Sequence, residues 1–362
     1  MKYDILPTLR LGNYNSRIIL MFQNESISNN NHGEVTIYSL SRDNAVEISK
    51  ISISGFHFCS IIKSSTGLFF GTFNNERKYL VYHIDYSLNL KKIEYSGTGF
   101  VRGLDNGLIL GLDRNSKKFV VSKKGKIVSS FSYEGNERER LFESGMIKYS
   151  DSPSDRITIF YYDYNSGKEV LQYKGLDRIG DSIQIESTLI ITWIEDWKKK
   201  HSEPKENYIC AIDIHSGQEI WKSYEIPGTR LAKGPNDELI IQGRETINFY
   251  DSTTGKQLKV YNAGGNLEYN TYIHTIENGK IYINNCGSRR ACLDMEKDSI
   301  DWEIEPLKYI IKEGGIRNII PLNNGEILGV SDTPYIVFKF DPHHPDNVAT
   351  SYRYNGKLMQ DK

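Results

Sequence analysis

A short hairpin recurs along the chain and constrains its fold more than any other feature. In each copy an Asp is followed four residues later by a Gly, with strand-like apolar residues on both sides. Three copies share this spacing: Asp163 with Gly167, Asp213 with Gly217, and Asp251 with Gly255. The Asp side chain can bond to backbone groups of a turn, and Gly accepts the positive φ that a tight reversal requires. The spacing therefore predicts antiparallel strands joined by tight turns.

The hairpin repeats with a regular period. Looser copies lie at Ser39, Asp85, Ser122, Asp294 and Asp341. Neighbouring copies are 37 to 50 residues apart, and the mean of about 43 residues is the length of one four-stranded propeller blade. Two further apolar runs precede most hairpins, as in 107–112 and 238–243. Runs that are apolar at nearly every position indicate strands covered on both faces.

These features predict an all-β fold, a β-propeller of four-stranded antiparallel blades that forms a single domain over residues 1–362. Eight hairpins favour eight blades, at 3–53, 56–95, 98–132, 141–174, 177–224, 228–262, 271–305 and 308–356. Seven blades are the alternative, if the strands of the first and last units combine into one shared closing blade.

One hairpin resembles a known repeat motif. Ala211, Asp213, Ser216, Gly217 and Trp221 resemble the Ala-x-Asp-x-x-Thr-Gly-x-x-x-Trp docking motif of pyrroloquinoline quinone-like, or quinoprotein dehydrogenase-like, propeller repeats. Other copies depart from it: Leu171 and Lys259 stand at the Trp position, and Asp298 replaces the Gly in the copy that ends at Trp302. The resemblance implies a diverged propeller in which Asp213, Gly217, Trp221, Asp251, Gly255 and Trp302 serve blade docking.

The resemblance also implies a test for a quinone cofactor. The adjacent cysteine pair expected of a quinoprotein dehydrogenase is absent, because Cys286 and Cys292 are separated by five residues. His343 and His344 are adjacent, but their Pro-flanked stretch is more typical of an exposed loop than of a metal site. We therefore expect no cofactor, no metal and no catalytic residues of these kinds.

Charge and hydropathy disfavour several partners. The 45 Lys and Arg residues nearly balance the 46 Asp and Glu residues, which gives no general attraction to nucleic acid or to an anionic membrane. No uninterrupted apolar stretch approaches the length of a membrane span, and the first ten residues do not resemble a signal peptide. Four scattered cysteines fit free thiols. We expect a cytoplasmic protein.

Long irregular segments are predicted at one end of the blades, opposite the Asp–Gly turns. They include 134–140, 151–156 and an insertion at 195–207. Because binding residues tend to lie on loops held by a rigid scaffold, this face is predicted to bind a protein partner. The predicted contacts are Arg138, Arg140, Trp197, Lys198, Lys199 and Lys200, since Trp and Arg are enriched at interface hot spots.

Two functions remain open at this point. The favoured one is a non-enzymatic propeller that binds a protein partner, with an immunity-type inhibitor of a toxin as an analogy from the fold resemblance. The alternative is a propeller hydrolase or lyase, similar to a glycosidase, with carboxylates at the channel mouth. Glu195 and Asp196 are the best local pair of carboxylates, although three neighbouring lysines favour a solvated loop. Raised carboxyl pKa values in a pocket would favour the enzyme.

Overall fold

The computed structural model contains β-strands joined by turns and loops. It describes residues 3–10, 17–24, 33–43, 47–64, 67–73, 79–85, 87–93, 99–103, 108–113, 118–124, 126–132, 137–150, 157–175, 178–194, 207–225, 227–243, 246–262, 272–284, 290–304, 316–331, 336–344 and 350–353. The chain forms two compact units, one of residues 1–132 with 304–362 and the other of residues 133–303. The prediction of an all-β protein is confirmed.

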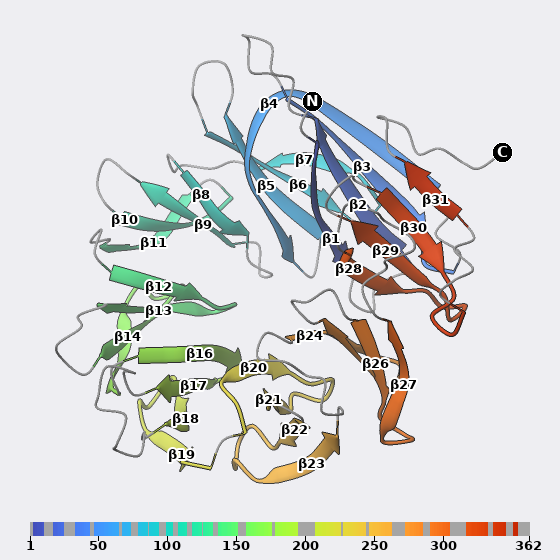
Figure 1. The fold of residues 1–362 in the computed structure, drawn as a ribbon. Coiled ribbons are helices and arrows are strands. Elements are labelled where there is room, and N and C mark those ends of the chain that lie inside the picture. Colours follow the sequence, from blue (N-terminus) through green and yellow to red (C-terminus); the bar gives the residue numbers. More distant parts are fainter. Residues whose placement is uncertain are drawn as a thin grey trace. The chain divides into compact units, whose positions relative to one another are not determined.

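The second unit consists of four antiparallel sheets of four strands each, in which strands consecutive in sequence are neighbours (Figure 1). The first sheet holds β12 (Glu137–Leu141), β13 (Gly145–Ser150), β14 (Thr158–Asp163) and β15 (Glu169–Lys174). The second holds β16 (Arg178–Ile185), β17 (Thr188–Ile194), β18 (Tyr208–Asp213) and β19 (Glu219–Ser223). The third holds β20 (Arg230–Lys233), β21 (Leu239–Gln242), β22 (Thr246–Tyr250) and β23 (Gln257–Asn262). The fourth holds β24 (Tyr272–Glu277), β25 (Lys280–Asn284), β26 (Arg290–Asp294) and β27 (Ser299–Ile304).

The first unit contains a seven-stranded sheet and two four-stranded sheets. The large sheet holds β1 (Tyr3–Arg10), β2 (Arg17–Asn24), β3 (Gly33–Ser41), β4 (Glu47–Ser64), β5 (Gly67–Phe73), β6 (Tyr79–Asp85) and β7 (Leu90–Ile93). The next holds β8 (Gly99–Gly103), β9 (Leu108–Asp113), β10 (Lys118–Lys123) and β11 (Lys126–Ser132). The last holds β28 (Ile316–Pro321), β29 (Ile327–Ser331), β30 (Ile336–Phe340) and β31 (Thr350–Arg353).

Strand β4 was not predicted as one element. Its first half pairs with β3 and its second half pairs with β5, so the large sheet is two four-stranded arrangements that share one long strand. β1 pairs with β2, and β31 pairs with β30 in a different sheet. The first and last units are therefore not merged into one shared blade by these pairings, and eight blades remain our prediction.

The sheets of the second unit bury their faces against one another. Residues of the first two sheets, such as Tyr161 and Trp193, share one hydrophobic cluster. A second cluster joins Ile190 to Ile241 across the next pair of sheets, and a third joins Ile247 to residues of the fourth sheet. These strands are apolar on both faces because both faces are covered, which is the reason that their sequences do not alternate.

The Asp–Gly hairpins form the turns between the third and fourth strands. In each of the three regular copies the Gly amide donates to the Asp carbonyl, as from Gly217 to Asp213 at 2.9 Å. The Asp carboxylate accepts further bonds from the turn, including one from the Ser216 amide at 2.7 Å. The φ angles of Gly167, Gly217 and Gly255 are 68°, 71° and 68°. The predicted turn chemistry is thus present in the structure.

The eighth residue after the Asp reaches the hairpin of the following sheet. Trp221 on β19 donates its indole N–H to the Ser252 carbonyl at 2.9 Å, and its ring lies against Gly255. Lys259, at the same position of β23, donates its ammonium to the Met295 carbonyl at 3.1 Å. Two chemically different side chains thus bind the same carbonyl position, one residue after the Asp of the next hairpin.

Two further copies of this position carry apolar residues. Leu171 on β15 lies next to Gly217, where an added Cβ would be 3.8 Å from its methyl group. Trp302 on β27 is buried, and its ring centroid lies 6.1 Å from that of Tyr282 in its own sheet. The described contacts to the next hairpin are thus made by a tryptophan, a lysine and a leucine at the same position of the repeat.

The hairpin that lacks the glycine provides a stability test. Asp298 occupies the Gly position and adopts a φ of 52°, a conformation that costs L-residues free energy. We expect Asp298→Gly to raise the free energy of unfolding by about 0.5 kcal/mol, because relief of strain exceeds the greater unfolded-state entropy of Gly. Asp298→Ala should lower it by a similar amount, since Asp tolerates this conformation better than Ala. Urea unfolding checks the order Gly, Asp, Ala, and a destabilised Gly variant would contradict it.

The beginning and the end of the chain are joined within the first unit. The Asn323 amide, after β28, donates to the Arg42 carbonyl at 3.0 Å. The Asn323 side chain also donates to the Asp43 carboxylate at 2.7 Å. These bonds connect residues about 280 positions apart, so the turn after β3 and the turn after β28 are held together.

Candidate protein-interaction surface

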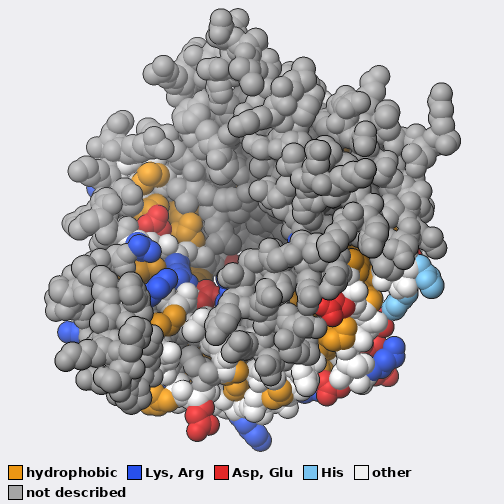
Figure 2. All heavy atoms as spheres, in the orientation of Figure 1, with side chains coloured by type: hydrophobic (Ala, Val, Ile, Leu, Met, Phe, Trp, Pro, Cys, Tyr) orange, Lys and Arg blue, Asp and Glu red, His pale blue; other side chains and the backbone are white. Residues whose placement is uncertain are grey.

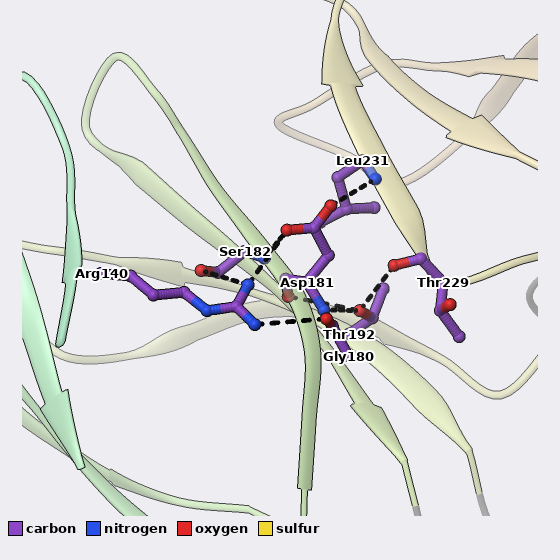
Figure 3. A network of polar contacts seen from close by, with 7 residues as sticks. All are labelled: Arg140, Gly180, Asp181, Ser182, Thr192, Thr229 and Leu231. Atoms are coloured by element: carbon purple, nitrogen blue, oxygen red, sulfur yellow. Dashed lines mark hydrogen bonds and ion pairs between the residues drawn. The ribbon is translucent and has the colours of Figure 1, made fainter. Parts of the chain in front are cut away.

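Arg138 and Arg140 were predicted to contact a partner from an irregular segment, and the structure places both of them in a strand. Both Arg138 and Arg140 lie in β12, which begins at Glu137, so the predicted irregular segment 134–140 ends earlier than expected. Arg138 is exposed, whereas Arg140 crosses to the neighbouring sheet (Figure 3). Its Nη1 donates to Asp181 Oδ1 at 3.0 Å, and its Nη2 donates to a β16 carbonyl.

Asp181 extends this network to a third sheet. Its Oδ2 accepts the Leu231 amide of β20 at 3.0 Å, while its own amide donates to Thr192 Oγ1 of β17 at 2.7 Å (Figure 3). Thr192 Oγ1 in turn donates to the Thr229 carbonyl at 3.0 Å. An irregularity in β16 between Ile179 and Ser182 places Asp181 where it can bind both neighbours.

The network is a structural tie between the first strands of three successive sheets. Lys, Arg, Asp and Glu side chains gather over β12 and β16 in the space-filling view (Figure 2). The side chains of Arg140 and Asp181 are only 28% and 35% exposed, and they bind each other. An arginine engaged in this way contributes to the scaffold, and its contact with a partner stays a prediction.

The other predicted contacts lie in the insertion between β17 and β18. Trp197, Lys198, Lys199 and Lys200 lie outside the described residues, as do Glu195 and Asp196. The strands that bear the insertion are well defined: Trp193 pairs with Tyr208 next to it, and Ile212 pairs with Glu219 next to the Asp–Gly turn. The insertion and the turn therefore leave opposite ends of the same sheet.

An aromatic base supports the insertion end of this sheet. The Trp193 ring is fully buried, and its centroid lies 6.0 Å from that of Tyr173 on β15 and 6.2 Å from that of Tyr208 on β18. Its indole N–H donates to the buried Cys210 sulfur at 3.2 Å. The ring also lies so close to Gly175 that a Cβ there would be 2.3 Å away. Trp193 thus fixes the positions of residues from two sheets.

Polar and aromatic side chains next to this base reach the surface. Tyr224, just after β19, is 62% exposed, and its ring centroid lies 5.7 Å from that of Tyr208. The ammonium of exposed Lys222 lies 3.8 Å from the Tyr208 centroid and 5.0 Å from the Tyr224 centroid. Tyr173 donates its hydroxyl to exposed Glu219 at 2.6 Å. We call these five residues, Tyr173, Tyr208, Glu219, Lys222 and Tyr224, the tyrosine–lysine patch.

Two phenols of the patch, those of Tyr173 and Tyr208, stay neutral at ordinary pH because their pKa values are raised. Burial raises the pKa of Tyr208 to about 12, and burial likewise raises the pKa of Tyr173. Burial also raises the pKa of the adjacent Cys210 thiol to about 12. Tyr173, Tyr208 and Cys210 therefore carry no negative charge beside Lys222 at ordinary pH.

The sequence did not single out this patch. Trp193 and Tyr208 lie within two residues of the insertion. Aromatic residues at both strand ends were therefore the sequence feature that could have indicated an aromatic patch there. Lys222 and Tyr224 follow Trp221 at alternate positions, which places them together on the strand face opposite Trp221. Their proximity to Tyr208 depends on the β18–β19 register, which pairs Cys210 with Lys222.

The described carboxyl groups with shifted pKa values do not resemble general acids. Hydrogen bonds from the Ser216 backbone and side chain lower the pKa of Asp213. The Thr253 hydroxyl lowers the pKa of Asp251, and the Lys297 amide lowers that of Asp294. A general acid needs a raised pKa, so these turn residues give no support to a glycosidase-like site.

The remaining predicted features are also placed by the structure. His343 and His344 are exposed in a turn after β30, where their amides bond to Asp341. Cys210 and Cys292 are buried free thiols, while Cys286 lies outside the described residues. In the part of the chain that is described, no helix has the length and apolarity required to cross a membrane.

Comparisons with known proteins find similar folds among solved structures. No family model matches the chain, and no curated protein matches it. A crystal structure of AztD from Citrobacter koseri has a TM-score of 0.52 at 9% identity, covering 88% of this chain and 92% of AztD. Apo AztD from the same organism has a TM-score of 0.50 at 10% identity, covering 87% and 91%. BamB from Moraxella catarrhalis has a TM-score of 0.47 at 11% identity, covering 93% and 99%.

At these identities the likeness to AztD concerns the fold alone. The narrower resemblance to quinoprotein-like repeats remains a prediction from the hairpin residues. With its successive four-stranded antiparallel sheets and this structural likeness, the chain has the fold of a β-propeller.

Proposed function

We propose that this propeller is a non-enzymatic scaffold that binds a protein partner through the insertion end of the β16–β19 sheet. The tyrosine–lysine patch carries the proposal. It presents an exposed tyrosine and an exposed lysine on a base of buried aromatic side chains, directly beside the longest predicted insertion. Tyrosine gives a large contact area at low conformational cost and is enriched at interface hot spots.

The insertion completes this surface in our proposal. Trp197 and the three lysines Lys198, Lys199 and Lys200 would contact the partner from the loop, while Lys222 and Tyr224 would contact it from the sheet. Arg138, exposed on β12, would lie at the margin of the contact. A long loop anchored on rigid strands can adapt to a partner while the strands keep the register of the contact.

A narrower form of the proposal concerns the kind of partner. In this form the protein has an immunity-type role, in which it binds and inhibits a toxin in the cytoplasm through the tyrosine–lysine patch and the insertion. This role predicts that cells lacking the protein are inhibited by the toxin when they grow beside wild-type cells of the same strain. Wild-type protein should restore growth, whereas a Tyr224→Ala variant that folds normally should not.

The binding proposal is tested by site-specific photo-crosslinking in the producing cell. A photoreactive phenylalanine analogue replaces Tyr224 in one variant and Leu258 in a control. Leu258 is a matched position, because it lies in the fourth strand of the next sheet and is 54% exposed, close to the 62% of Tyr224. We expect position 224 to capture one discrete protein on irradiation and position 258 to capture none.

Binding measurements with the captured protein then test the surface itself. Tyr224→Ala should weaken the complex about tenfold or more, as expected for an interface aromatic, and Leu258→Ala should leave it unchanged. Equal capture at both positions, or no capture at position 224, would contradict the proposal.

A further inference from the structure

Lys222 has an arrangement that its role in the fold does not explain. Its ammonium lies over the rings of Tyr208 and Tyr224, and within the described part of the chain it has neither a hydrogen bond nor an ion pair. The lysine is exposed, so its charge reaches the surface. An ammonium can donate three hydrogen bonds, and the aromatic rings provide no oxygen or nitrogen acceptor for them.

A second lysine of the same kind provides a comparison. The Lys259 ammonium, on β23, lies 4.2 Å from the Tyr261 ring centroid. In that case the ammonium also donates to the Met295 carbonyl at 3.1 Å, so it joins two sheets. The same cation–ring contact is thus part of the scaffold at Lys259, whereas at Lys222 the donor capacity is available to a ligand.

The rings around Lys222 prepare it for binding. A free lysine side chain has many rotamers, and a ligand that immobilises it must overcome the loss of their entropy. Contact with two rings reduces this freedom before a ligand arrives, because the ammonium is attracted to the ring faces. A group that binds Lys222 therefore meets a cation already held in one region of the surface.

The adjacent acidic side chain does not cancel this charge. Glu219 accepts the Tyr173 hydroxyl at 2.6 Å, which directs its carboxylate toward β15. Tyr173 and Tyr208 remain neutral because burial raises the pKa of both phenols. Glu219 thus has a hydrogen-bond partner, whereas the Lys222 ammonium has no hydrogen-bond acceptor among the described residues.

We infer that the partner of this surface presents a carboxylate to Lys222, from an acidic segment that also contacts the Tyr224 ring. This inference rests on the proposed function and specifies the chemistry of its partner. The carboxylate would accept hydrogen bonds from the ammonium while the ammonium keeps its place over the two rings. An acidic partner also agrees with the three lysines predicted in the insertion.

The inference is tested on the full-length protein with two capped ten-residue peptides. One alternates Glu with Ser and the other alternates Lys with Ser. Affinity is followed at about 20 mM salt, where charge interactions are weakly screened, from the amide NMR shifts of Ser223 and Tyr224. Lys222→Met should weaken binding of the Glu peptide about threefold to fivefold, the range of an exposed ion pair.

Three variants distinguish a specific Lys222–carboxylate contact from a general loss of positive charge. The matched variant Lys259→Met should leave the Glu-peptide affinity unchanged, because that ammonium serves the fold. Lys222→Arg should retain binding, and Tyr224→Leu should give an intermediate loss because the cation remains while one ring is removed. The inference is overturned if Lys222→Met binds the Glu peptide like the wild type, or if Lys259→Met weakens it equally.

The tests also distinguish this inference from the proposed function. If the wild type binds the Lys peptide more tightly than the Glu peptide, the patch receives a cation of the partner, and the inference is wrong. If position 224 captures a protein but Lys222→Met leaves its affinity unchanged, the carboxylate contact is wrong while the binding function stands. Failure of capture at position 224 refutes the binding function itself.

Discussion

Trp193→Ala is expected to lower the free energy of unfolding by about 3–5 kcal/mol, the range for removing a fully buried large aromatic side chain. Trp193 is 0% exposed and joins two sheets through its contacts with Tyr173 and Tyr208. The substitution removes these contacts and the N–H bond to Cys210, and the space beside Gly175 cannot be filled without backbone movement. The result should be a cavity between the first two sheets of the second unit.

Urea unfolding followed by circular dichroism measures this effect. Trp193→Phe keeps an aromatic ring in the same space and should cost less, about 1–2 kcal/mol, because it loses mainly the N–H bond and part of the volume. Tyr224→Ala, a change of an exposed residue, should stay within about 0.5 kcal/mol. Equal losses for Trp193→Ala and Trp193→Phe would show that ring packing is not the main contribution.

Trp193 shows where prediction from sequence ends. The run Thr188–Ile194 is apolar at nearly every position, which correctly predicts a strand covered on both faces. Within such a run the sequence does not indicate which side chain joins two sheets. The repeat period led to the prediction that Trp221 and Trp302 serve blade docking, and the position of Trp197 in a long loop led to its prediction as a partner contact. Among the described tryptophans, Trp193 is the most completely buried, and it does not occupy a position of the repeat.

Turn chemistry was the most predictable part of the fold. The Asp-to-Gly spacing depends on local backbone geometry, so Gly167, Gly217 and Gly255 adopt the expected positive φ. Asp298 keeps this conformation without glycine, which shows that the hairpin imposes it. The strand pairs that follow these turns, and the propeller fold as a whole, were predicted correctly for the same reason.

Side-chain partners far apart in sequence were not predictable. Arg140 was predicted to contact a partner, and its bond to Asp181, 41 residues later, was not predicted. Nothing local marks Asp181 for this role, because an irregularity in β16 directs it toward its partners. Lys222 likewise depends on the strand register that brings it to Tyr208. The candidate surface thus lies at the sheet end where the insertion was predicted, and the proximity of its described residues depends on a strand register that the sequence does not show.

Gly255→Ala is expected to cost more than Gly217→Ala, although both glycines have nearly the same φ. Ala in this conformation should cost about 1–2 kcal/mol at either position. At Gly217 the new methyl group meets only Leu171 at 3.8 Å, an ordinary contact. At Gly255 it would lie 2.6 Å from the Trp221 ring. Displacing that ring also weakens its bond to Ser252, so the total should reach about 3–4 kcal/mol.

A double-mutant cycle isolates the contact between the hairpins. Trp221→Leu places at β19 the residue that β15 carries naturally at Leu171, and so converts the Trp221–Gly255 contact into a copy of the Leu171–Gly217 contact. In that background Gly255→Ala should cost only the 1–2 kcal/mol expected at Gly217, which gives a coupling of about 1–3 kcal/mol between the two positions. If the cost of Gly255→Ala is the same with Trp221 as with Leu, the ring does not press on this turn. In that case Trp221 would stabilise its own sheet and would not dock it to the next one.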